Sequence, residues 1–73
     1  LKNNNLATKD ELFGFFQQLE DALDDKGFFR PPERRAVMVR NLRAMFTRTQ
    51  ATQQEVRTLR GIVATLVRGR RVT

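Results

Sequence analysis

The stretch VRTLRGIVATLVRGRR (Val56–Arg71) decides the fold, because its apolar residues recur at the spacing of an α-helix. The apolar stripe consists of Val56, Leu59, Ile62, Val63 and Leu66. Gly61 lies in the middle of this predicted helix, where glycine costs about 0.5–1 kcal/mol relative to alanine. Two roles could favour it: close packing against another element, or approach of a phosphate to the backbone. We favour packing, and phosphate approach stays open.

Two more helices are predicted before this one, so the periodicity gives helices over residues 9–26, 32–47 and 53–68. Thr8 with Glu11, and Thr52 with Glu55, have the spacing of a capping box at a helix start. Gly27 suits the left-handed position that ends a helix in a Schellman motif. No alternating run predicts a strand. The sequence therefore predicts an all-α, compact three-helix domain over residues 8–68, between a linker or cloning remnant (1–7) and a frayed tail (69–73).

The core of this domain is predicted from the stripes of the first two helices. They contribute Leu12, Phe15, Phe16, Leu19 and Leu23, and then Met38, Leu42, Met45 and Phe46. Phe13 falls off its stripe and is expected to contact another domain or chain, or to cover a core edge.

Charge is divided unevenly along the 73 residues, whose net charge is +6. Residues 1–29 hold three lysines against six carboxylates (net −3), whereas residues 30–73 hold eleven arginines against two glutamates (net +9). Arginine binds phosphate and carboxylate in a bidentate manner, so the arginines indicate either a polyanion partner or pairing with the acidic first helix. No apolar run approaches the length of a membrane span, and we expect no membrane partner and a cytoplasmic location.

Catalysis is not expected from these residues, because the chain contains no Ser, His, Cys, Tyr or Trp. Asp21, Asp24 and Asp25 form the densest group of carboxylates. No loop holds them in a calcium-binding pattern, so we favour a solvated face or an arginine partner from another helix over a cation site. We expect no catalytic, cofactor or metal site in this chain.

The arginines of the second and third helices are the candidate binding residues. On a helical wheel, Arg40, Arg43, Arg57 and Arg68 face solvent. Arg60 lies near the edge of the apolar stripe, where we favour a structural role, such as pairing with the first helix. No stacking platform for bases is evident, so contacts with nucleic acid are expected to go to phosphates.

Four motifs carry a resemblance to a known family. They are ATKDEL (Ala7–Leu12), GFFRPPE (Gly27–Glu33), RNLRAMFTR (Arg40–Arg48) and QEVRTLRGI (Gln54–Ile62). In this order and spacing they resemble the C-terminal extension of the TrmJ-like tRNA/rRNA 2′-O-methyltransferases of the SPOUT (SpoU/TrmH) class. The resemblance spans about residues 7–66. Ala51 replaces a more usual leucine, which questions the packing of the turn before the third helix.

The resemblance implies an accessory domain that helps to hold tRNA, or rRNA, for a catalytic domain elsewhere in the parent enzyme. In that family an N-terminal knotted domain binds S-adenosylmethionine, dimerises and methylates a ribose 2′-hydroxyl in the tRNA anticodon loop. The residues expected to bind RNA in this chain are Arg40, Arg43, Arg57, Arg60 and Arg68.

Two other classes of function remain open. A helix-turn-helix DNA-binding domain would place Gln53, Gln54 and Arg57 in the major groove, although the predicted turn is longer than usual for that motif and lacks glycine. A protein-interaction or dimerisation module would use Phe13 and the acidic helix.

Overall fold

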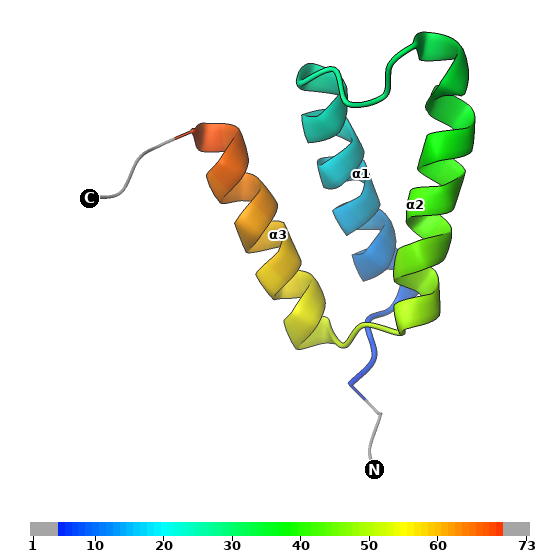
Figure 1. Cartoon of the computed structure of the whole chain (residues 1–73). Coiled ribbons are helices and arrows are strands. Elements are labelled where there is room, and N and C mark those ends of the chain that lie inside the picture. Colours follow the sequence, from blue (N-terminus) through cyan, green and yellow to red (C-terminus); the bar gives the residue numbers. More distant parts are fainter. Residues whose placement is uncertain (1–4, 70–73) are drawn as a thin grey trace.

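The computed structural model describes residues 5–69, and it confirms an all-α domain of three helices. They are α1 (Lys9–Asp25), α2 (Arg35–Thr49) and α3 (Gln53–Arg68), with a short 3-10 turn, η1 (Pro32–Arg34), before α2. Figure 1 shows α1 between α2 and α3. The domain measures 42 × 37 × 16 Å, so the three helices form a single layer rather than a closed bundle.

Both predicted capping boxes are present at the starts of α1 and α3. The backbone N–H of Glu11 donates to the Thr8 hydroxyl (3.1 Å), and the Thr8 N–H donates to the Glu11 carboxylate (2.8 Å). Thr52 and Glu55 repeat this exchange at 3.1 and 2.9 Å. Each box satisfies N–H groups that the helix itself leaves without acceptors, and so fixes where the helix begins.

The predicted Schellman motif ends α1. Gly27 has a left-handed backbone (φ 75°). The Phe28 N–H donates to the carbonyl of Leu23 (2.9 Å), and the Gly27 N–H donates to that of Asp24 (3.1 Å).

The predicted bounds of the second helix are wrong at both ends. Pro32 opens η1 rather than an α-helix, and α2 continues two residues past Thr47, to Thr49. The Thr49 hydroxyl donates to the Met45 carbonyl (3.0 Å), which keeps this residue within the helical turn. Gln50 then ends α2 in the left-handed conformation (φ 55°). The turn to α3 is consequently three residues long, so the length argument against a helix-turn-helix fails.

The buried core joins α1 to α3. Phe15 and Phe16 of α1 pack with Val56 and Val63 of α3 and with Ala51 of the turn. Phe46 of α2 meets Phe15 edge to face, with ring centroids 5.0 Å apart. The predicted core role of these three phenylalanines is confirmed. Ala51 is itself buried, so a small side chain fits this turn.

Three residues predicted on the core stripes are instead exposed. Met45, Ile62 and Leu66 are 47%, 50% and 69% exposed. In a single layer, α3 packs against another helix on one side only. α1 therefore covers only part of the apolar stripe of α3, and the rest of the stripe stays exposed. Phe13 lies off its stripe as predicted and is half exposed.

The segment just before α1 is tied to the turn between α2 and α3. The Ala7 N–H donates to the Ala51 carbonyl (3.0 Å), and the Gln53 N–H donates to the Asn5 carbonyl (2.7 Å). Residues 5–7 of the predicted linker are thus held by the helical domain. The rest of that linker (1–4) and all of the predicted tail after Gly69 lie outside the described residues.

Candidate nucleic-acid interface

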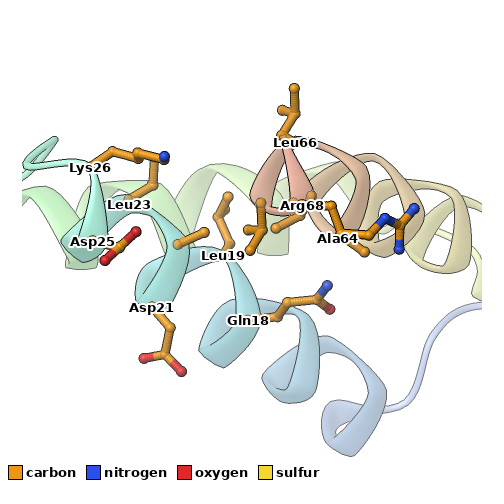
Figure 2. A pocket seen from close by; sticks show the side chains of 12 residues that line it. Gln18, Leu19, Asp21, Leu23, Asp25, Lys26, Ala64, Leu66 and Arg68 are labelled. Carbon is orange, nitrogen blue, oxygen red and sulfur yellow. The ribbon is translucent and has the colours of Figure 1, made fainter. Parts of the chain in front are cut away.

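The outer face of α3 is the side opposite Val56 and Val63, which pack against α1. We use this name for the exposed residues Gln54, Arg57, Thr58, Gly61 and Thr65, together with Arg68 near the end of the helix, whose side chain also lines the pocket between α1 and α3 (Figure 2). The Thr58 and Thr65 hydroxyls donate to the carbonyls of Gln54 and Gly61, four residues earlier (3.1 and 2.9 Å). The face carries two positive charges and no carboxylate of its own.

Gly61 sits at the centre of this face with open space before it. A Cβ placed on Gly61 would meet no atom of residues 5–69 within 4 Å. The prediction that Gly61 allows close packing against another element of this chain is therefore wrong. Close approach occurs instead at Gly14 of α1, where a Cβ would lie 3.1 Å from Nη1 of Arg60.

Arg57 and Arg68 flank Gly61 along the helix. Both are exposed, and neither takes part in an ion pair among residues 5–69. They are eleven residues apart, which corresponds to about 16 Å along the helix axis. Glu55, the carboxylate nearest to Arg57 in sequence, accepts the N–H of Thr52 in the capping box. The two guanidinium groups therefore remain available to an external anion.

Arg43 does not face solvent freely, which corrects the prediction from the helical wheel. Its Nε and Nη2 donate to the two carboxylate oxygens of Glu20 at 2.6 and 2.8 Å. This hydrogen bonding raises the pKa of Arg43 above its ordinary value. The guanidinium also lies 5.4 Å from the ring centroid of Phe13 and 5.5 Å from that of Phe16. A wheel drawn for one helix cannot show that the neighbouring helix presents a carboxylate.

Arg60 has the structural role that we favoured, but with an uncharged partner. Its Nε donates to Oε1 of Gln18 (2.7 Å), and Nε2 of Gln18 donates to the Arg60 carbonyl (3.1 Å). This reciprocal pair fastens α3 to α1 where Gly14 leaves room for the guanidinium.

The acidic cluster of α1 finds the arginine partner that we expected. Arg35 of α2 donates to both carboxylate oxygens of Asp24, at 2.9 and 2.7 Å. The hydrogen bond lowers the pKa of Asp24 below its usual 3.8. Within residues 5–69, no group of three or more acidic, histidine or cysteine side chains is placed to hold a metal ion.

Arg40 is exposed on α2, as predicted, but not beside the arginines of α3. Figure 1 shows α1 between α2 and α3, so Arg40 and the arginines of α3 belong to helices on opposite sides of α1. Arg48, also exposed, lies two turns after Arg40 on α2. The sequence analysis did not select Arg48, because it ended the predicted helix at Thr47. Residues 47–50 are all polar, so no apolar residue after Phe46 indicated a further turn of helix. The candidate arginines thus form two separate groups.

No helix within residues 5–69 has the length and apolar character needed to cross a bilayer. The described helices therefore offer no transmembrane segment.

Comparison with known proteins finds a family model and a curated enzyme that are similar to this sequence. The family model described as "tRNA methyltransferase TrmJ, C-terminal domain" matches residues 10–73. A tRNA (cytidine/uridine-2′-O-)-methyltransferase TrmJ from Pectobacterium atrosepticum is 42% identical over 57 residues, which cover 78% of this chain and 23% of that enzyme. The chain thus spans about a quarter of the relative's length. No solved structure matches it.

Proposed function

Since the chain belongs to the family of TrmJ C-terminal domains of tRNA methyltransferases, we propose that it is an accessory domain that binds tRNA through the outer face of α3. The observation that carries the proposal is the open backbone at Gly61 between two arginines that form no ion pair with residues 5–69. A phosphate placed over Gly61 would lie between Arg57 and Arg68. Contacts of this kind position an RNA without reading its sequence.

The five arginines expected to bind RNA divide into three roles in this proposal. Arg57 and Arg68 make the principal phosphate contacts. Arg40, on the other side of α1, contributes a separate contact when the RNA reaches round α2. Arg43 and Arg60 act indirectly, because their guanidinium groups already hold α1 against its two neighbours.

The parent enzyme, in this proposal, is an S-adenosylmethionine-dependent 2′-O-methyltransferase of the cytoplasm, dimeric through a catalytic domain outside this chain. The present residues do not fit the cofactor. No buried side-chain polar atom among residues 5–69 is left without a hydrogen-bond partner, so these residues offer no unpaired buried group to hold the adenine of the cofactor. The contribution of this chain is binding energy for the RNA.

A helix-turn-helix DNA-binding domain is the second candidate, favoured by the three-residue turn between α2 and α3. In that case Gln53, Gln54 and Arg57, at the start of α3, would contact bases in the major groove.

Binding of the 73-residue chain to tRNA and to duplex DNA, measured by fluorescence anisotropy over a range of salt concentrations, tests both candidates. We expect tighter binding to tRNA. Arg57→Ala and Arg68→Ala should each reduce the slope of log affinity against log salt by about one unit, with similar losses for different tRNA sequences.

Arg34→Ala is the matched control, because Arg34 is exposed but lies at η1, away from α3. It removes the same charge and should change the slope less. Circular dichroism verifies that each variant stays helical. Unchanged slopes for Arg57→Ala and Arg68→Ala would reject the interface. Sequence-selective binding to duplex DNA would favour the second candidate.

A further inference from the structure

A pocket lies between the N-terminal half of α1 and the C-terminal half of α2. We call it the Phe13 pocket; its lining includes Lys9, Asp10 and Phe13 of α1, and Arg43 and Thr47 of α2. Its volume is about 380 Å³, which is in the range of pockets that hold small ligands. All of its lining residues belong to α1 or α2, so the pocket is separate from the outer face of α3.

Phe13 exposes a large apolar ring in this pocket. The residue is 51% exposed, whereas Phe15 and Phe16 of the same helix are buried. The Arg43 guanidinium lies 5.4 Å from the centroid of the Phe13 ring, an attraction that holds the ring against α2. A flat aromatic ring that is fixed on one side and open to water on another can stack with a planar group of a ligand.

The polar groups around the Phe13 ring match the edge of a nucleobase. Lys9 and the Thr47 hydroxyl can donate hydrogen bonds, and the Asp10 carboxylate can accept them. The pair with Glu20 uses Nε and Nη2 of Arg43, so Nη1 stays outside that pair. Nucleobases are planar and carry both acceptors and donors on their edges. A phosphate would use the donors alone and would be repelled by Asp10, so this set fits a base better than a phosphate.

Basic side chains border the pocket on both helices. Lys9 opens α1, and the exposed Arg40 lies one turn before Arg43 on α2. Neither Lys9 nor Arg40 forms an ion pair with residues 5–69. Sites for single-stranded nucleic acid combine such cations, which follow the backbone, with an aromatic ring on which a base stacks. The surroundings of Phe13 thus favour a nucleic-acid strand over an uncharged ligand.

We propose that the Phe13 pocket binds one unpaired nucleobase of an RNA strand, which stacks on the Phe13 ring. This inference rests on the proposed function, because it takes RNA as the ligand, but it uses other residues than the outer face of α3. Every base has a face that can stack, so the pocket adds affinity for unpaired segments without selecting their sequence. The sequence showed no stacking platform because Arg43 and Thr47 come from another helix than Phe13.

Binding of the 73-residue chain to a short fluorescein-labelled oligouridine, measured by anisotropy over a range of salt concentrations, tests the pocket. Phe13→Ala should weaken binding at least about fivefold, the usual loss for one stacked base. The slope of log affinity against log salt should stay unchanged, because no phosphate contact is lost. Phe28→Ala is the matched control, since Phe28 is also 51% exposed but lies outside the pocket. Circular dichroism verifies that both variants remain folded.

Two further measurements separate stacking from other losses. Phe13→Trp keeps an aromatic ring, so it should retain the affinity, and oligouridine should quench its fluorescence because the chain has no other Trp. An abasic strand of the same length keeps the phosphates without the bases. Wild type and Phe13→Ala should therefore bind this strand equally.

Equal affinities of wild type and Phe13→Ala for oligouridine would overturn the pocket and would favour a protein contact at Phe13. The same loss on the abasic strand, or an unquenched Trp at saturation, would also overturn it. In each case the proposed function stands if Arg57→Ala still reduces the salt slope for tRNA. Oligouridine binding that depends on Phe13, with tRNA binding that does not depend on Arg57, would keep the pocket and reject the outer face of α3. A chain that binds neither RNA would overturn both.

Discussion

Arg43 of α2 and Glu20 of α1 form two parallel hydrogen bonds, 2.6 and 2.8 Å long, that join the two helices. The Glu20 side chain is only 7% exposed, whereas that of Arg43 is 35% exposed. The pair lies beside the phenylalanine core, since the Arg43 guanidinium also stands over Phe16. The buried carboxylate of Glu20 thus accepts its hydrogen bonds from Arg43, a side chain that remains partly exposed to water.

Glu20→Gln should lower the free energy of unfolding by about 1–3 kcal/mol, because it replaces charge-assisted hydrogen bonds in a buried position. The exposure of Arg43 places the effect in the lower part of this range. Urea denaturation followed by circular dichroism measures it. Asp24→Asn is the control, since the Asp24–Arg35 pair has the same bidentate geometry but is exposed on both sides. Equal losses in the two variants would show that burial of Glu20 adds nothing.

The Asp24–Arg35 pair predicts a small pH dependence of stability. The hydrogen bond from Arg35 holds the pKa of Asp24 below 3.8 in the folded chain. A carboxylate with a lowered pKa stabilises the fold above its unfolded pKa, and that contribution disappears as the pH falls through the folded pKa. The difference in urea midpoint between wild type and Asp24→Asn should therefore be constant near neutral pH and shrink below about pH 4. A constant difference down to pH 2 would contradict this assignment.

Phe15→Ala should cost about 3–5 kcal/mol, enough to unfold so small a domain. Phe15 is 1% exposed and contacts both Phe16 and Phe46. Phe13→Ala removes the same side chain from a half-exposed position and should cost far less. Leu42→Ala and Leu59→Ala should fall between them, because both leucines are half-buried. Thermal unfolding ranks the four variants, and comparable losses for Phe13 and Phe15 would contradict the described core.

What the sequence predicts well is local. Each capping box follows from two residues that interact within one turn of helix. Thr8 and Glu11 fix the start of α1, and Thr52 and Glu55 fix the start of α3. The end of α1 follows from Gly27 for the same reason. The end of α2 was missed because Gln50 stops it in a left-handed conformation that is uncommon for a residue other than glycine.

What the sequence misses depends on how the helices are placed in space. Periodicity assigned Ile62 and Leu66 to the core, but it cannot indicate how much of a stripe a neighbouring helix covers. The wheel placed Arg43 in solvent because Glu20 belongs to another helix. Nor can a wheel show that α1 lies between α2, which carries Arg40, and α3, which carries Arg57 (Figure 1).

Gly61→Ala separates the two roles considered for this glycine. The backbone there has no positive φ, and a Cβ meets no atom of residues 5–69 within 4 Å. Alanine should therefore stabilise the chain by about 0.5–1 kcal/mol, the usual gain inside a helix. If a phosphate approaches the backbone between Arg57 and Arg68, the added methyl group should weaken tRNA binding at the same time. Urea denaturation and anisotropy on the same sample measure the two effects.

Opposite signs make this result specific, because a variant that is more stable yet binds RNA less tightly cannot owe its loss to unfolding. Gly14→Ala provides the control: its Cβ would press on the Arg60 guanidinium at 3.1 Å, inside the α1–α3 contact and away from the outer face of α3. That variant should leave RNA affinity unchanged wherever it remains folded. A Gly61→Ala chain that is stabilised and binds tRNA as tightly as the wild type would place the phosphates elsewhere on the outer face. Losses of stability in Gly61→Ala would instead contradict the open space described at this position.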